Sequence, residues 1–260
     1  MVSREQLILD EIRLASIKAF GGKLTGVYVH GSMALNCFHW DHSDIDFIVV
    51  LEDGPSQAQK EAYISALLDI SERGPQKGLE MSVVLREYTR HFLYPTPYEL
   101  HYSNAHLSRC REDLEGFCRQ MNGTDKDLAA HFTIIRNACI VLCGAPAEDT
   151  FGNVPGECYR DSIRLDIEQA ERDILEDPVY IILNLCRVLA YQSDGLILSK
   201  KEGGLWGVGQ IDARYREIIQ AALDSYQHSL PFEAASDRER LTEFAGYAHC
   251  RIFSESGVEG

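Results

Sequence analysis

The sequence predicts two parts, an α/β part followed by an all-helical part. Up to about residue 126, apolar residues at helical spacing alternate with short runs rich in β-branched and aromatic side chains. After that point the pattern is helical almost throughout. A segment with two glycines and a proline, residues 152–156, is the best candidate for a boundary. We therefore expect an α/β domain over residues 1–153 and an all-α helical bundle over residues 154–260.

In the first part, the pattern predicts two helices and three strands. The helices are expected at residues 4–19 and 56–72, where apolar residues recur at helical spacing. The strands are expected at residues 27–29, 45–51 and 79–85. The second of these strands is apolar almost throughout, which is typical of a strand buried on both faces.

After residue 126, the pattern predicts a series of helices, the first of which lies before the expected domain boundary. They are expected at residues 127–142, 159–175, 179–191, 212–227 and 237–252. The first of them is followed by Gly144 and Pro146, which are common just past a helix end. The acidic run at residues 166–173 lies in the helix expected at residues 159–175 and is typical of a solvated helix face. The alternative is that part of this run attracts a polycation.

The chain is acidic, with 25 basic and 40 acidic residues and a formal net charge of −15. This charge repels nucleic-acid backbones and anionic membranes, and it suits a cationic small molecule. It serves solubility equally well. The longest apolar run, residues 45–51, is too short to cross a bilayer. We expect a protein without a nucleic-acid or membrane partner, and we favour a monomer.

The start of the chain and its cysteines indicate a cytoplasmic protein. No signal-peptide pattern is visible at the start, and the eight cysteines lack the spacing of zinc sites. Several cysteines, such as Cys139 and Cys186, lie in apolar surroundings that we expect to be helical. We interpret them as buried reduced thiols, which are typical of the cytoplasm.

The clearest chemical pattern lies around the second expected strand. Gly31-Ser32 follows the first expected strand, and Asp44 and Asp46 enter the second. Two carboxylates at i and i+2 on an extended segment point to the same side, and their repulsion favours a divalent cation such as Mg²⁺ or Mn²⁺ between them. Gly31 lets the backbone approach a phosphate closely, and the hydroxyl of Ser32 can donate a hydrogen bond to it.

A third carboxylate, Glu80, lies in the third expected strand, which is otherwise apolar. Glu80 joins the same cluster if this strand neighbours the second one. A lone Asp-x-Asp is most often a solvated loop or a helix cap. The combination with Gly-Ser and with an acid in a third strand is more specific, and it predicts a metal site formed by Asp44, Asp46 and Glu80.

At these positions the chain resembles a known superfamily. Residues 29–32 together with residues 43–47 are similar to the signature of the polymerase-β-type nucleotidyltransferases. Over nearly its full length, the chain resembles the aminoglycoside adenylyltransferases that modify streptomycin and spectinomycin. The further segments that carry this resemblance are residues 79–83, 98–100, 127–129, 144–146, 179–191 and 200–206. The resemblance implies an N-terminal nucleotidyltransferase domain with a small mixed sheet and a C-terminal helical domain, with substrate bound between them.

The resemblance also implies roles for single residues. Asp44 and Asp46 would hold Mg²⁺ and bridge it to the phosphates of ATP, and Glu80 would take the proton from an antibiotic hydroxyl. The adenylyl group of ATP would pass to that hydroxyl with release of pyrophosphate. Nucleotide contacts are expected from Gly31, Ser32, Ser43, Lys200, Lys201 and Arg214. Acceptor contacts are expected from Glu99, Tyr102, Glu202 and Trp206.

The chain departs from the streptomycin-modifying relatives at two places. Those relatives carry a tryptophan shortly after the Glu-Leu pair, whereas residues 101–106 contain none. They also place an acid directly before the residue that resembles Trp206, where this chain has Leu205, and the nearest acid is Glu202. Both differences favour spectinomycin over streptomycin as the acceptor, and they leave a different acceptor open.

Two alternatives keep the same chemical residues. In the first, the acceptor is a protein or another metabolite. In the second, the chain binds a nucleotide without catalysis, which the presence of Glu80 opposes because a binding module has little need of a base. Among the other residues, His39 and His42 are interpreted as loop hydrogen-bonding groups and not as metal ligands, and Trp206 is either a core residue or a stacking platform for a ligand ring.

Overall fold

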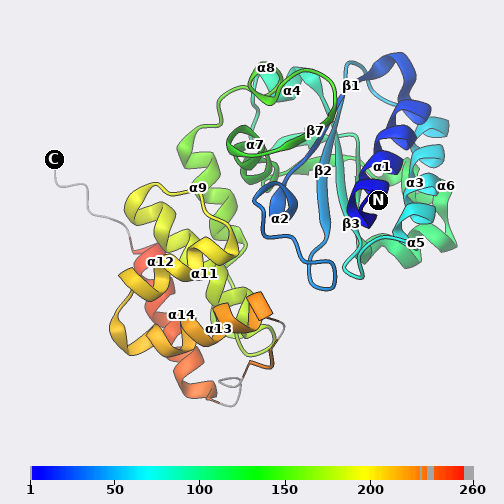
Figure 1. The fold of residues 1–260 in the computed structure, drawn as a ribbon. Coiled ribbons are helices and arrows are strands. Elements are labelled where there is room, and N and C mark those ends of the chain that lie inside the picture. The colour runs from blue at the N-terminus through cyan, green and yellow to red at the C-terminus, as the bar shows by residue number, and fades with distance from the viewer. Residues whose placement is uncertain (1, 229, 233–236, 255–260) are drawn as a thin grey trace. The chain divides into compact units, whose positions relative to one another are not determined.

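The computed structural model describes residues 2–228, 230–232 and 237–254. It confirms the expected fold class, a mixed sheet with helices followed by a helical region (Figure 1). The chain divides into two compact units, residues 1–159 and 160–260, whereas the boundary expected from the sequence lies after residue 153. Within the described part of the chain, no helix is both long and apolar enough to cross a membrane.

The first unit is built on a mixed sheet. The strands are β1 (Leu24–Val29), β2 (Ile45–Leu51), β3 (Leu79–Leu85), β4 (Thr96–Tyr98), β5 (Leu100–Tyr102), β6 (Gly123–Asp125) and β7 (Ile140–Cys143). Five of them form one sheet in the order β5-β3-β2-β1-β7, and β4 pairs with β6 in a second. Strands β2 and β3 are parallel, and the other neighbouring strands are antiparallel. The start of β2 therefore lies beside the start of β3.

Helices cover both faces of this sheet. They are α1 (Arg4–Phe20), α2 (Gly31–Ala34), α3 (Gln57–Ser71), α4 (Arg86–Arg90), α5 (Leu107–Glu112), α6 (Leu114–Gln120), α7 (Leu128–Asn137) and α8 (Ala147–Thr150), with the 3-10 turns η1 (Gly21–Lys23) and η2 (Asn104–His106). Figure 1 shows α1 and α3 on one side of the sheet and α7 on the other. Phe47 and Val49 of β2 belong to the core that α1 and α3 close, whereas Ile48 and Val50 pack with α7. Because strand side chains alternate, Asp46 shares the α7 face with Ile48.

The second unit is helical. Its elements are α9 (Gly156–Leu165), which begins in the first unit, α10 (Ala170–Asp173), α11 (Pro178–Asp194), α12 (Lys200–Gln210), the 3-10 turn η3 (Ala213–Tyr215), α13 (Arg216–His228) and α14 (Arg238–Phe253). Helix α11 contributes more residues to the core of this unit than any other described helix, and Ile182, Leu185 and Leu189 are among them. Helices α12, α13 and α14 pack against it.

One expected helix is partly a strand. The sequence pattern predicts a helix over residues 127–142, but α7 ends at Asn137 and residues 140–143 form β7. The short apolar run 138–142 is compatible with either structure, because a run of that length shows no period. This segment forms a strand because it pairs with the edge of β1, where Val29 lies opposite Ile140. Cys139, expected within the helix, consequently lies half-buried between the two elements.

Two further differences concern the helical part. The helix expected over residues 159–175 is divided into α9 and α10. Helix α12 was not expected, because its glycines lower helix propensity. Tight packing explains them: a Cβ on Gly203 would lie 2.6 Å from Cγ of Arg187, and one on Gly207 would lie 2.6 Å from Sγ of Cys186.

Candidate active site

Three carboxylates meet at the start of β2 and β3. In the parallel register Asp46 lies opposite Glu80, and Asp44 precedes Asp46 by two residues on the same face. Each of the three offers an oxygen atom within 4.8 Å of the others. The cluster expected from the sequence is therefore present, and its oxygen donors are of the kind that Mg²⁺ or Mn²⁺ prefers.

Gly31 cannot carry a side chain where it stands. Its φ is +61°, and a Cβ would lie 1.9 Å from Oδ2 of Asp46. The backbone N–H of the preceding residue, His30, donates to the carbonyl of Asp46 at 2.9 Å. The glycine thus allows the turn into α2 to lie directly against a carboxylate of the cluster.

The two serines of the signature differ in their surroundings. Oγ of Ser32 is buried and has no hydrogen-bond partner among the described residues. Ser43 is also buried, but its Oγ accepts a hydrogen bond from the backbone N–H of His39 at 3.1 Å. An unpartnered buried hydroxyl is uncommon in folded proteins, so Ser32 is well suited to bind an oxygen atom of a ligand.

The loop before β2 contains the two histidines of the signature region. The rings of His39 and His42 stack with centroids 4.9 Å apart, and the carbonyl of His39 accepts from the backbone N–H groups of His42 and Ser43. Among the described residues, the metal-ligand cluster consists of the three carboxylates without these histidines.

Glu80 has the environment of a carboxyl group that can accept a proton. Burial raises the pKa of Glu80, Asp44 raises it further, and His131 acts in the opposite direction. A raised pKa makes a carboxylate a better general base near neutral pH, provided that it is still ionised. The positive charge of a protonated His131 helps to keep Glu80 ionised.

His131 and Asp127 belong to the site, although no signal in the sequence singled out the histidine. Nε2 of His131 lies 3.2 Å from Oδ2 of Asp127, one helical turn earlier in the chain. Burial alone would lower the pKa of His131, but Asp127, Glu80 and Asp46 raise it to about 10. The ring of His30 lies 4.6 Å from that of His131, and burial and this neighbour hold the pKa of His30 well below its usual range. The Asp-x-x-x-His spacing on a helix is the one pattern that could have indicated the pair.

A further histidine follows the carboxylates on the same face of the sheet. His101 in β5 lies opposite Ser82 in β3, and a hydrogen bond of 2.9 Å joins Nδ1 of His101 to Oγ of Ser82. Burial and His106 lower the pKa of His101 to about 4, so its ring is neutral at pH 7. This pair extends the polar part of the face beyond Glu80.

Two predicted acceptor residues of the first unit lie elsewhere. Tyr102 is fully buried in the core, and its hydroxyl lies 3.4 Å from Oγ of Ser71. The structure does not bring Tyr102 to the carboxylate cluster, because it pairs with Met81 of β3 on the face that α1 and α3 close. Glu99 donates its backbone N–H to Val83, and its side chain lies beside Gly54, past the far end of β2. The structure does not bring Glu99 to the carboxylate cluster.

The remaining predicted residues lie in the second unit, four of them at α12. Ser199 and Glu202 form a capping box, in which Oε2 of Glu202 accepts from the N–H of Ser199 at 2.9 Å. Nζ of Lys200 lies 4.3 Å from the centre of the Tyr180 ring, and Lys201 is exposed. Nε1 of Trp206 donates to Oδ2 of Asp194 at 2.7 Å, and its ring packs partly against the core. Glu202 thus has a structural role in addition to any contact with a ligand.

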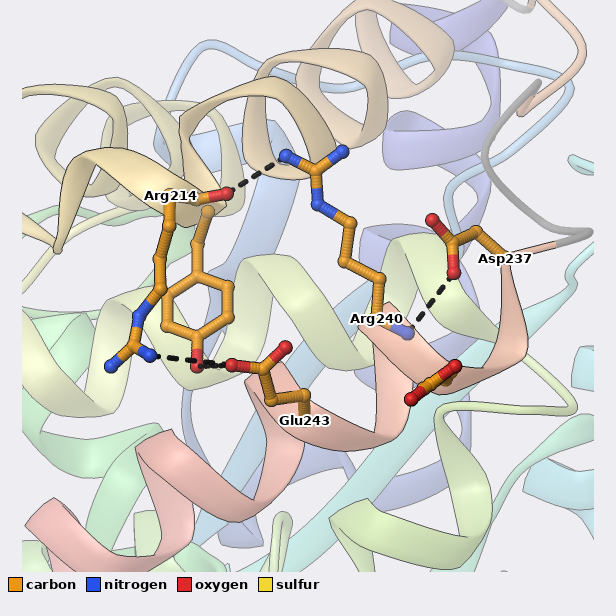
Figure 2. Close-up of a pocket in the computed structure, with 6 residues that line it drawn as sticks. Arg214, Asp237, Arg240 and Glu243 are labelled. Atoms are coloured by element: carbon orange, nitrogen blue, oxygen red, sulfur yellow. Dashed lines mark hydrogen bonds and ion pairs between the residues drawn. The ribbon is translucent and has the colours of Figure 1, made fainter.

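Arg214, the third basic candidate, is surrounded by carboxylates. Figure 2 shows its guanidinium directed at Glu243. Nη1 of Arg214 lies 3.3 Å from Oε1 of Glu243, and Nε of Arg214 lies 3.4 Å from Oδ2 of Asp212. The pocket around it is lined by Arg214, Tyr215, Asp237, Glu239, Arg240 and Glu243. Because its charge is already compensated, Arg214 is the weakest of the three candidates for a contact with a triphosphate.

Comparisons with known proteins agree with this geometry. A family model described as a nucleotidyltransferase domain matches residues 11–101, which include the three carboxylates. A second, described as the C-terminal domain of aminoglycoside adenylyltransferase, matches residues 149–251. Together the two matches include most of both units.

Curated relatives and a solved structure extend the comparison. The chain is 26% identical over 235 residues to an aminoglycoside (3'') (9) adenylyltransferase of Escherichia coli, with 88% of each chain covered. It is 26% identical over 212 residues to a spectinomycin 9-adenylyltransferase of Staphylococcus aureus, with 80% of each covered. The structure of a spectinomycin adenyltransferase from Enterococcus faecalis, determined with ATP and spectinomycin, matches with a TM-score of 0.76 at 19% identity and covers 94% of this chain and 98% of its own.

These findings confirm the resemblance from which the site residues were predicted. The relatives are enzymes by name, and the carboxylate cluster is intact. They therefore oppose the alternative of a nucleotide-binding module without catalysis. The chain is a nucleotidyltransferase, and over most of its length it resembles the aminoglycoside adenylyltransferases.

Proposed function

We propose that this enzyme transfers the adenylyl group of ATP to a hydroxyl group of an aminocyclitol or aminoglycoside antibiotic, with spectinomycin favoured over streptomycin, and releases pyrophosphate. The observation that carries the proposal is the cluster of Asp44, Asp46 and Glu80 beside Gly31 and Ser32. The relatives named for adenylylation of aminoglycosides and of spectinomycin support the choice of acceptor.

The carboxylates would hold Mg²⁺, or Mn²⁺ in its place. Three carboxylate oxygens within 4.8 Å of one another form a hard donor set, and their mutual repulsion is relieved by a divalent cation. When bound, such a cation neutralises phosphate charge. Asp44 and Asp46 are its principal ligands in this proposal, and Glu80 completes the set.

Gly31 and Ser32 would hold the phosphates. Gly31 brings the backbone of α2 close to Asp46, and the buried hydroxyl of Ser32 is free to donate to a phosphate oxygen. Ser43 uses its oxygen as an acceptor from His39 and retains its own hydrogen for donation. Lys200 and Lys201 remain the better of the basic candidates for the triphosphate, because the charge of Arg214 is already paired.

Glu80 would act as the general base. Its raised pKa and its place opposite Asp46 suit removal of a proton from the acceptor's hydroxyl. The hydroxyl oxygen then forms a bond to the α-phosphorus, and the bond from that phosphorus to the bridging oxygen breaks. Pyrophosphate leaves with the electron pair, and the proton stays on Glu80 until it passes to solvent.

The preference for spectinomycin depends on α12. Leu205 is 52% exposed, so an apolar side chain occupies the position where the streptomycin-modifying relatives carry an acid. Glu202, the nearest acid, is engaged in the cap of the same helix. With these contacts changed, a polycationic acceptor loses a carboxylate partner. The net charge of −15 still favours a cationic acceptor in general.

Pyrophosphate release with a panel of acceptors tests this proposal. The purified enzyme, ATP and Mg²⁺ are combined separately with spectinomycin, with streptomycin and with no acceptor. Release with spectinomycin alone is expected. Equal release with streptomycin would contradict the role of Leu205. Release with neither antibiotic would overturn the proposed acceptor and favour a protein or another metabolite.

A further inference from the structure

His131 is a charged group of the site for which the proposed reaction gives no role. It lies on α7, the helix that covers the face of the sheet carrying Asp46 and Glu80. Its Nε2 is fixed by Asp127, the residue just before α7, at 3.2 Å. Its ring rests against that of His30, with centroids 4.6 Å apart. The ring is thus held at Nε2 by Asp127 and lies beside His30, and the side chain is 15% exposed.

The other ring nitrogen of His131, Nδ1, lacks a hydrogen-bond partner within the described part of the chain. This atom is also fully buried. Oγ of Ser32 is in the same condition on α2, directly after the glycine that lies against Asp46. An orphaned buried polar atom costs free energy, so two of them beside one carboxylate cluster indicate a site that is completed by a ligand with several oxygen atoms.

The charges around His131 decide which ligand oxygen fits. The carboxylate of Asp127, 3.2 Å from Nε2, favours the protonated ring, in which both nitrogens carry hydrogen. Nδ1 is then a cationic donor, which bonds most strongly to an anionic oxygen. It cannot bind the ammonium groups of an aminoglycoside acceptor, because these are also cationic donors. A phosphate oxygen of the nucleotide is the group that matches.

We propose that His131 is a nucleotide-binding residue: with Nε2 held by Asp127 and its ring packed on His30, it donates from Nδ1 to a phosphate oxygen of the nucleotide beside Asp46 and Glu80. The inference rests on the proposed function, since the nucleotide enters the site through that reaction. It places a positive donor for the phosphates within the α/β unit itself, in addition to the candidate lysines of α12.

Two substitutions at the same position separate this role from a structural one. In His131→Gln the amide nitrogen can occupy the place of Nε2 and keep the bond to Asp127, but the donor at Nδ1 is lost. In His131→Asn the amide nitrogen can occupy the place of Nδ1, while the bond to Asp127 is lost. A nucleotide-binding role therefore makes Gln the more damaging change, and a role limited to holding Asp127 makes Asn the more damaging one.

Titration calorimetry measures the equilibrium binding of α,β-methylene-ATP in the presence of Mg²⁺ and in the absence of any acceptor. We expect His131→Gln to bind about 10- to 100-fold more weakly than the wild type, the size of one charge-assisted hydrogen bond. His131→Asn should lose less, and the exposed His91→Gln serves as the matched control with unchanged affinity. Binding by His131→Gln within about twofold of the wild type, or a larger loss in His131→Asn, overturns the proposal.

A second variant keeps the test decisive if His131→Gln does not fold. Asp127→Asn retains an oxygen that can accept from Nε2 but removes the charge that fixes the ring, and we expect nucleotide affinity to fall about three- to tenfold. Unchanged affinity in this variant also overturns the proposal. The binding test contains no acceptor, so its result does not depend on which molecule is modified. If the wild type binds the nucleotide but modifies no antibiotic, the proposed function is wrong and the role of His131 is still supported.

Discussion

The sheet face beneath α7 has a polar end and an apolar end, although the same strands form both. Asp46 and Glu80 lie opposite each other near the start of β2 and β3, while Val50 and Val84 are the opposed pair near the other end. The apolar end packs against Phe132 and is closed. The polar end gathers carboxylates whose repulsion opposes folding. The first end stabilises the unit, and the second has the oxygen donors that suit it to bind ligands.

The largest effect that would test this division is expected at Gly31. In Gly31→Ala the new Cβ overlaps Asp46, so the carboxylate or α2 must move. We expect turnover to fall by at least about 100-fold, because a small displacement of a catalytic group has an effect of this size. Gly21→Ala is the matched control, because Gly21 also has a positive φ but no atom lies within 4 Å of its Cβ. The control should lose stability through backbone strain and keep its turnover. Equal turnover in both variants would show that the close approach to Asp46 is not needed.

At the apolar end the expected effect is on folding. Phe132 is buried against Phe92 and Phe151, and Phe132→Ala should lower the free energy of unfolding by about 3–5 kcal/mol in urea titrations. Well below the melting temperature, nucleotide affinity should stay within about threefold of the wild type. Thr133→Ala, one residue further and half-buried, is the control with a loss below about 1 kcal/mol. A large loss of affinity in folded Phe132→Ala would mean that the two ends are not separable.

The pH dependence of stability sharpens the comparison through His131. Its pKa in the folded protein, about 10, is above its ordinary value of 6.5, so it contributes stability that is fully present below pH 6.5 and is lost as the pH rises towards 10. Relative to His131→Gln, the wild type should therefore lose about 3–8 °C in melting temperature between pH 6.5 and pH 10. The comparison with the variant removes the contribution of tyrosines, cysteines and lysines that titrate in the same range. Parallel curves for the two proteins would contradict a protonated His131.

The smallest expected effect is that of the cation alone. Mg²⁺ at millimolar concentration should raise the melting temperature by about 1–4 °C, because it binds the folded cluster and relieves its repulsion. Asp46→Asn should remove most of this shift, and NaCl at equal ionic strength is the control. An equal shift in wild type and variant would place the bound cation elsewhere.

The carboxylate cluster could be predicted from the sequence because it depends on local rules. The bounds of β2 and β3 agree with the expected strands, and alternation of side chains along a strand puts Asp44 and Asp46 on one face. Adjacency of two parallel strands then brings Glu80 to the same place. Each step needs only a period of two and a short connection.

The parts that could not be predicted depend on pairing between distant segments. Tyr102 lies in a motif that suggested a substrate contact, but the register of β5 against β3 sends its side chain into the core. His131 is remote from Glu80 in sequence, and only the packing of α7 on the sheet brings the two charges together. The position of Glu99 likewise depends on the hydrogen bond from its backbone N–H to the carbonyl of Val83, which no local sequence pattern predicts.

The most direct test of the polar end is turnover by Glu80→Gln. Pyrophosphate release from ATP and Mg²⁺ is measured with spectinomycin for the wild type, for Glu80→Gln and for the exposed control Glu87→Gln, with nucleotide affinity measured in parallel. We expect the control to match the wild type. Glu80→Gln should lose about 100- to 10,000-fold in turnover while it binds the nucleotide within about threefold, because the base is lost and the fold is kept. Turnover by Glu80→Gln close to that of the wild type would contradict the account.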